Sequence, residues 1–172
     1  MSKRALKIYL KELKKNQLEE QIIDLYERFG EVKTYYDFIF NPKEDKLINE
    51  AKTKIEKEYF PTTRKRPKAR RGVAQKYFKH FLQIGMEERL LADLMLFNLE
   101  TAQRFNAKRP QKTEAFFKSM ANSFVQALNF VNYHGLQKEF QERLNTIVIE
   151  AKNQDWYNWE FLLEKVDELG SE

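Results

Sequence analysis

Six cationic side chains crowd into one short stretch of the sequence, RKRPKARRG at residues 64–72. Residues 59–86 contain no Asp or Glu, so no carboxylate within that range can neutralise them. Guanidinium and ammonium groups in such a run are suited to contacts with phosphates and other anions. The cations are Arg64, Lys65, Arg66, Lys68, Arg70 and Arg71, and Lys76 and Lys79 continue the charge into the segment that follows.

Three details distinguish this run from a merely solvated loop, which is the simplest explanation of any charged stretch. Lys68, Arg70 and Arg71 stand near the start of a predicted helix, where the helix dipole disfavours each cation by roughly 0.3 to 1 kcal/mol. Polar and positive side chains continue along the exposed face of that helix, so the charge forms a surface. Pro67 restricts the loop and Gly72 permits close approach of the backbone, a combination that suits phosphate contacts.

We therefore predict a non-enzymatic helical module that binds nucleic-acid backbone or another polyanion through the basic segment 64–79, with little sequence preference. The alternative is a protein-interaction adaptor whose basic loop docks on an acidic partner. An anionic lipid surface is a third candidate, although no apolar anchor beside the run is evident in the sequence. Lys3, Lys7 and Lys11 would assist only if the fold places the first helix alongside.

The residues needed for other kinds of site are missing from the sequence. Its five glycines are isolated and form neither a GxG nor a GxxxxGKS/T pattern, which excludes dinucleotide and P-loop phosphate-binding loops. With no cysteine and two histidines, the chain has too few ligands for a structural zinc site. His134 precedes Gly135, where an imidazolium favours a helix end. His80 is interpreted as packed or solvated, and the alternative is contact with an anion, because it lies on the helix that follows the cations. We expect no catalytic residue, no metal and no cofactor.

Two carboxylates in the middle of the chain are explained by local ion pairs. Asp93 with Arg89 and Glu100 with Arg104 are spaced i, i+4 on one predicted helix. This spacing predicts pairs on a helix surface that have no catalytic role.

Apolar residues recur at helical spacing throughout, and no segment alternates with the period of two expected of a half-buried strand. The sequence predicts an all-α protein of about nine short-linked antiparallel helices, in a bundle or a superhelical array of helical hairpins. The helix ends are predicted from Ser2, Asn16, Asn41-Pro42, Thr113 and Asp155 as starts and from Gly30, Gly85, Gly135 and Gly170 as stops.

We expect one domain over residues 1–172, with an exposed basic connector at about 61–72.

The segment TYYDFIF at residues 34–40 has aromatic faces that could stack on nucleic-acid bases. Its apolar residues share the face that the helix must bury, so core packing is favoured. The residues predicted to be buried are Tyr35, Phe78, Phe81, Phe97, Phe124 and Leu144.

The composition suits solvated helices around a core, with 42% hydrophobic and 33% charged residues. The charge is uneven, because residues 1–15 carry a net +5 and residues 136–172 a net −5. No stretch approaches the roughly 18 consecutive apolar residues that a membrane span requires. The N-terminus lacks the apolar region of a signal peptide, so we expect a cytoplasmic protein.

Several segments resemble a family of small bacterial proteins catalogued as a domain of unknown function. The similarity rests on KRALKIYLKELKKNQLEEQIIDLYERF, YYDFIFNPKEDKL, EAKTKIEKEYFP and KARRGVAQKYFKHF, so it covers roughly the first half of the chain well and the rest loosely. The resemblance implies a cytoplasmic helical protein and supplies no activity, cofactor or site residue.

Overall fold

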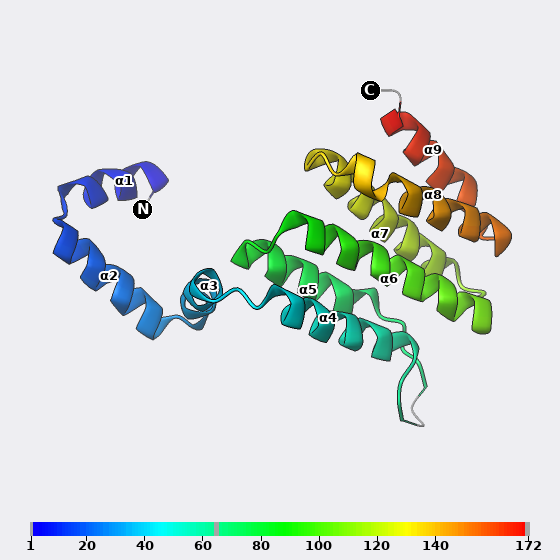
Figure 1. The fold of residues 1–172 in the computed structure, drawn as a ribbon, viewed down its shortest axis with the longest axis horizontal. Helices are drawn as coiled ribbons and strands as arrows, with labels where there is room; N and C mark the ends of the chain where they lie inside the picture. Colours follow the sequence, from blue (N-terminus) through cyan, green and yellow to red (C-terminus); the bar gives the residue numbers. More distant parts are fainter. Residues whose placement is uncertain (1, 64–65, 171–172) are drawn as a thin grey trace. The chain divides into compact units, whose positions relative to one another are not determined.

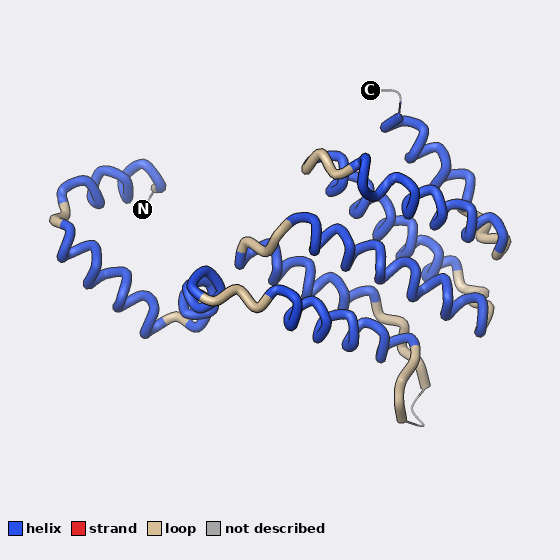
Figure 2. Tube along the Cα trace, in the orientation of Figure 1, coloured by secondary structure: helices blue, strands red, loops and turns tan. Residues whose placement is uncertain are grey.

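Helices account for most of the computed structural model, which describes residues 2–63 and 66–170 (Figure 1). Over these residues the chain forms nine α-helices and no strand (Figure 2). This confirms the predicted all-α fold. No helix in this part of the chain is both long and apolar enough to span a bilayer. The helices are α1 (Lys3–Glu12), α2 (Lys15–Arg28), α3 (Gly30–Phe40), α4 (Glu44–Tyr59), α5 (Arg71–Ile84), α6 (Glu88–Lys108), α7 (Glu114–Tyr133), α8 (Gln137–Asn153) and α9 (Trp159–Gly170).

The helices fall into two compact units, Met1–Lys43 and Glu44–Glu172. The N-terminal unit contains α1, α2 and α3, and the C-terminal unit contains α4 to α9. The expectation of a single domain over residues 1–172 stays a prediction.

In the C-terminal unit, alternate helices run in the same direction. Lys52 on α4 contacts Asp93 on α6, and one turn further along α4, Glu56 contacts Arg104. Hydrogen bonds between α6 and α8, and between α5 and α7, also follow both helices in the same direction. Because consecutive helices also contact each other, the unit is a series of antiparallel hairpins (Figure 1). One layer contains α4, α6 and α8, and the other contains α5, α7 and α9.

The centre of this unit is α6, which packs against α4, α5, α7 and α8 and has twelve buried residues. Its neighbours direct aromatic and aliphatic side chains toward it. Phe78, Phe81, Phe124 and Leu144 are buried as predicted, whereas Phe97 is only half-buried.

The prediction that the TYYDFIF segment packs in a core is wrong. Tyr35 is 41% exposed and Phe40 is 81% exposed. Tyr36 is half-buried, with its ring against those of Tyr26, Tyr35 and Phe40. The helical periodicity of the segment is real, but three short helices do not enclose it. None of the described residues of α1, α2 and α3 is buried.

Several helix ends follow the local signals in the sequence. The Ser2 hydroxyl accepts the backbone N–H of Ala5 at 3.2 Å and so caps α1. Gly85 and Gly135 have φ of +78° and +68°, the left-handed conformation that ends a helix most readily at glycine.

Other predicted helix ends are wrong. Asp155 does not cap α9, because it lies in a tight turn at the end of α8 with φ of +52°. In that turn the N–H of Trp156 donates to the carbonyl of Ala151 at 3.0 Å. The other differences are that α2 begins at Lys15 rather than after Asn16, α4 begins at Glu44 rather than at Asn41-Pro42, and Gly30 opens α3 instead of closing α2.

Replacing Phe124 with Ala should lower the free energy of unfolding by about 3–5 kcal/mol, because the side chain is fully buried and its removal leaves a cavity. The matched control is Tyr133→Ala on the same helix. Tyr133 is 86% exposed, so its removal should cost less than about 0.5 kcal/mol. Urea denaturation followed by circular dichroism measures both, and equal losses would contradict this packing of α7.

Candidate polyanion-binding surface

Six of the eight predicted cations lie in the described part of the chain, and they form two groups. The first group is exposed to solvent, and the second contacts neighbouring helices. Arg64 and Lys65 lie outside the described residues. The first group consists of the exposed Arg66 and Lys68 in the connector and Lys76 and Lys79 on α5. The second consists of Arg70, which is also exposed, and the half-buried Arg71, both at the start of α5.

Arg70 forms a two-pronged ion pair with Glu58 in the last turn of α4. Its Nε and Nη2 groups donate to the two carboxylate oxygens, each at 2.9 Å. Hydrogen bonding from Arg70 holds the pKa of Glu58 below its ordinary value. Arg70 is therefore neutralised by a carboxylate from just outside the interval 59–86, because the connector folds back onto Glu58, the last acidic residue before it.

The backbone of the connector is tied to the same glutamate. The N–H groups of Lys68 and Ala69 both donate to the carbonyl oxygen of Glu58 at 3.0 Å. Ala69 has φ of +48°, a left-handed conformation that residues with a side chain adopt infrequently. Glu58 thus fixes the end of the connector through both its carbonyl and its carboxylate.

Arg71 joins α5 to α7. Its Nε donates to the Ser123 hydroxyl at 2.8 Å, and its Nη2 donates to the side-chain carbonyl of Gln126 at 3.2 Å. Gln75, one turn further along α5, donates to the same Gln126 oxygen at 2.8 Å. Both acceptors of Arg71 are neutral, so these hydrogen bonds position its guanidinium without cancelling its charge.

The two helices joined in this way carry no acidic residue apart from Glu114, the first residue of α7. No Asp or Glu occurs in residues 59–86 or in residues 115–138. We call the exposed side chains of α5, of α7 after Glu114 and of connector residues 66–70 the acid-free surface. On α7 it includes the amides of Asn122 and Asn129 and the aromatic ring of Tyr133.

The carboxylates that flank the two intervals in the sequence lie at the ends of the helices or are paired. Glu58 is paired with Arg70, and Glu114 is paired with Lys118 at 2.9 Å. Glu87 and Glu88 lie beyond the end of α5, at the turn into α6. The contribution of α7 is not among the features predicted from the sequence. The available signal was the long interval without acidic residues after Glu114.

The opposite layer, α4, α6 and α8, is joined by ion pairs between helices. Asp93 accepts hydrogen bonds from Lys52 at 2.6 Å and from Arg143 at 2.7 Å. Arg143 also donates to both carboxylate oxygens of Glu100, at 2.8 and 3.0 Å. Burial of the Asp93 carboxyl raises its pKa, but the hydrogen bonds from Lys52 and Arg143 outweigh burial and hold the pKa below its ordinary value.

These contacts overturn the predicted i, i+4 pairs on α6. Arg89 is paired with Glu139 on α8 instead of Asp93, and Arg104 is paired with Glu56 on α4, at 3.2 Å, instead of Glu100. Charged side chains on α6 therefore contact the adjacent helices of their layer.

The two histidines have different surroundings. His134 is the C-cap of α7, as its position before Gly135 predicted, and its Nδ1 lies 4.0 Å from a carboxylate oxygen of Glu88. His80 is exposed on α5, with its ring beside Phe81. Across the described residues, no group of three or more His, Asp or Glu is arranged to hold a metal ion.

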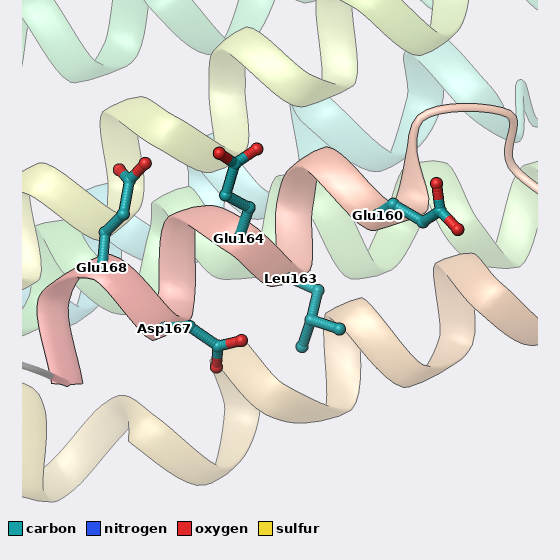
Figure 3. Close-up of a pocket in the computed structure, with 5 residues that line it drawn as sticks. All are labelled: Glu160, Leu163, Glu164, Asp167 and Glu168. Atoms are coloured by element: carbon teal, nitrogen blue, oxygen red, sulfur yellow. The ribbon is translucent and has the colours of Figure 1, made fainter.

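Acidic side chains line a hollow along α9 (Figure 3). Lys165 contacts Glu168 at 2.7 Å, but the other acidic groups leave the lining predominantly negative. Such a surface repels a polyanion, so α9 does not extend the acid-free surface. The lining consists of Glu160, Leu163, Glu164, Asp167 and Glu168.

A family model described as a family of unknown function, DUF6155, matches residues 1–169. The chain belongs to this family. The match extends over nearly the whole chain, beyond the first half in which the resemblance was strongest. No curated protein and no solved structure matches the chain.

Replacing Arg143 of this DUF6155 chain with Ala should destabilise it by about 1.5–3 kcal/mol, because two half-buried carboxylates lose their charged hydrogen-bond donor. Arg104→Ala on α6 is the control. Its ion pair with Glu56 is more exposed, so the loss should stay below about 1 kcal/mol. Chemical denaturation gives both values, and a smaller effect for Arg143→Ala than for Arg104→Ala would contradict the network.

Glu58 should make the stability of the DUF6155 chain depend on pH. Arg70 lowers the pKa of the Glu58 carboxyl in the folded chain. The Glu58 carboxylate of the unfolded chain therefore binds a proton more readily than that of the folded chain. The stabilisation is complete above the unfolded-state pKa of about 4.3 and is lost as the pH falls through the lower folded-state value.

Denaturation midpoints measured between about pH 6 and pH 3 test this dependence. Arg70→Gln should reduce the loss of stability on acidification, because Glu58 then titrates closer to its unfolded value. Arg66→Gln removes an exposed cation of the same connector and should keep the wild-type profile. Identical profiles for the wild type and Arg70→Gln would show that the pair has no role in stability.

Proposed function

We propose that this protein is a non-enzymatic binding module that contacts the backbone of nucleic acid through the acid-free surface. The single observation that carries the proposal is the lack of any carboxylate on α5 and on α7 beyond its first residue, Glu114, two helices held side by side by Arg71 and Gln75. A phosphate backbone approaching these helices meets cations and amides without a repelling carboxylate. The proposed phosphate contacts are Arg64, Lys65, Arg66, Lys68, Lys76 and Lys79.

Arg70 and Arg71 have a different role in this proposal from the one that their sequence positions suggested. Glu58 neutralises Arg70, which therefore anchors the connector. Arg71 retains its charge at the first turn of α5, where no acidic residue offsets the helix dipole. A phosphate group near this turn would reverse the unfavourable interaction between the dipole and the cations.

The exposed side chains of α7 suit contacts with the same ligand. Amides such as those of Asn122 and Asn129 donate hydrogen bonds to phosphate and sugar oxygens. Tyr133 presents a ring that is 86% exposed and suited to stacking on an unpaired base. No base-reading motif accompanies them, so we expect binding with little sequence preference.

Salt dependence provides the test. If about six cations contact phosphates, log K should fall against log salt with a slope near −5 on duplex and near −4 on single strands. Replacing Arg66, Lys68, Lys76 and Lys79 with Ala should flatten the duplex slope by about 3 to 4 units. Titration of labelled random oligonucleotides at several salt concentrations measures both slopes. The variant retains Arg70 and Arg71, so the contacts with Glu58, Ser123 and Gln126 stay intact.

A control variant of equal charge separates this site from the net charge of the chain. It replaces four exposed lysines elsewhere, Lys43, Lys46, Lys138 and Lys152, with Ala and should keep a slope close to that of the wild type. Absence of binding at low salt, or equal slopes in the two variants, would rule out the acid-free surface as a nucleic-acid site. Binding to polyglutamate but not to nucleic acid would favour the adaptor that docks an acidic partner.

A further inference from the structure

The N-terminal unit lacks a core of its own. No described residue of α1, α2 or α3 is buried. A unit of this size without disulfides seldom buries enough apolar area to be stable alone, and association with another chain is one of the usual remedies. Its exposed large apolar side chains are Leu6, Ile8, Tyr9, Ile22, Ile23, Leu25, Phe29, Tyr35, Ile39 and Phe40.

Many of these side chains form stripes suited to another helix. On α1, Leu6 lies on one face with Tyr9 and Leu10, and the C-cap residue Leu13 follows at the same spacing. On α2, the stripe of Leu18, Ile22 and Leu25, which continues to Phe29, has the alternating spacing of four and three residues that characterises helix–helix seams.

The charges of α1 and α2 are opposite. Among its residues, α1 carries four basic side chains and one acidic one, whereas α2 carries four acidic and two basic ones. The two helices diverge in an open V (Figure 1). A groove is lined by side chains of both segments. The groove combines apolar side chains from the end of α1 with acidic and amide side chains of α2. Its lining residues are Tyr9, Leu13, Gln17, Glu20, Gln21, Asp24 and Arg28.

We propose that the N-terminal unit binds the N-terminal unit of a second copy of this chain, with the basic α1 of each copy against the acidic α2 of the other. A two-fold dimer requires one surface that is complementary to itself, and a basic helix joined to an acidic helix meets this requirement. The contact is made twice, so two sets of opposite charges and two sets of apolar stripes are brought together. This dimer is independent of the proposed nucleic-acid contacts.

Charge reversal tests the dimer in the full-length chain. One variant replaces Lys3, Lys7 and Lys11 with Glu, and the other replaces Glu19, Glu20 and Glu27 with Lys. Each alone should self-associate at least about tenfold more weakly than the wild type, because like charges then face each other. An equimolar mixture should form a heterodimer. The reversed, acidic α1 of the first variant then faces the reversed, basic α2 of the second, and the unchanged basic α1 of the second faces the unchanged acidic α2 of the first. Sedimentation velocity over a range of concentrations measures all four samples.

A third charge variant distinguishes this dimer from head-to-tail docking of α1 on the acidic hollow of α9. It replaces Glu160, Glu164 and Glu168 with Lys and should dimerise as the wild type does. Loss of the dimer in this variant would place the contact on α9 and overturn the proposal. A wild-type chain that stays monomeric at all concentrations would also overturn it, as would a mixture that fails to associate.

Apolar variants provide a second measurement that does not depend on reversed charges. Ile22→Ala combined with Phe29→Ala should weaken the dimer, because both side chains belong to the proposed seam. Ile149→Ala combined with Tyr157→Ala removes two comparably exposed side chains from the C-terminal unit and should leave it unchanged. Equal effects of the two pairs would contradict an interface on the N-terminal unit.

Discussion

A helix that is buried on most of its circumference can pair its buried polar side chains only within the protein, and this constraint organises the C-terminal unit around α6. Gln103 donates to the carbonyl of Ile147 at 2.7 Å, and Asn106 donates to Gln154 at 2.8 Å. On the α4 side, Tyr59 donates to Asn98 at 3.4 Å, and burial raises the pKa of this tyrosine. A buried polar group without its partner costs roughly 1–3 kcal/mol, so these contacts fix how α4 and α8 sit against α6.

The two layers around α6 differ in how they use charge. In the layer of α4, α6 and α8, cations contact carboxylates of the neighbouring helix, as in the Lys52–Asp93–Arg143 network. In the other layer, α5 and α7 are joined through neutral groups, with Arg71 donating to Ser123 and Gln126. In the layer of α4, α6 and α8, carboxylates neutralise these cations. On α5 and α7 the cations are not neutralised in this way and face solvent, and for this reason we place the proposed binding surface there.

The N-terminal unit differs from the C-terminal unit because its apolar side chains are not buried in a core. Its helices are as amphipathic as those of the C-terminal unit, yet their apolar faces are not enclosed, as Phe40 shows with 81% exposure. Association of two copies would bury such side chains and would also carry two acid-free surfaces in one assembly. Two linked sites bind a long polyanion more tightly than one, because the second contact becomes intramolecular. The two proposals are therefore compatible, although each has its own test.

The spacing of apolar and capping residues in the sequence determined the all-α class and many helix ends. The concentrated run of cations is likewise visible in the sequence itself. These features depend on residues within one or two turns of each other, as in the cap formed by Ser2 on Ala5. Tertiary structure alone decided which cations form ion pairs. Arg66 and Arg70 look equivalent in the sequence, but of the two it is Arg70 that pairs with Glu58 across the connector. It likewise gave Asp93 the distant partners Lys52 and Arg143 in place of Arg89. The physical reason is that helical periodicity specifies which face of a helix is apolar, whereas the partner of a charged side chain depends on which other helix packs beside that face.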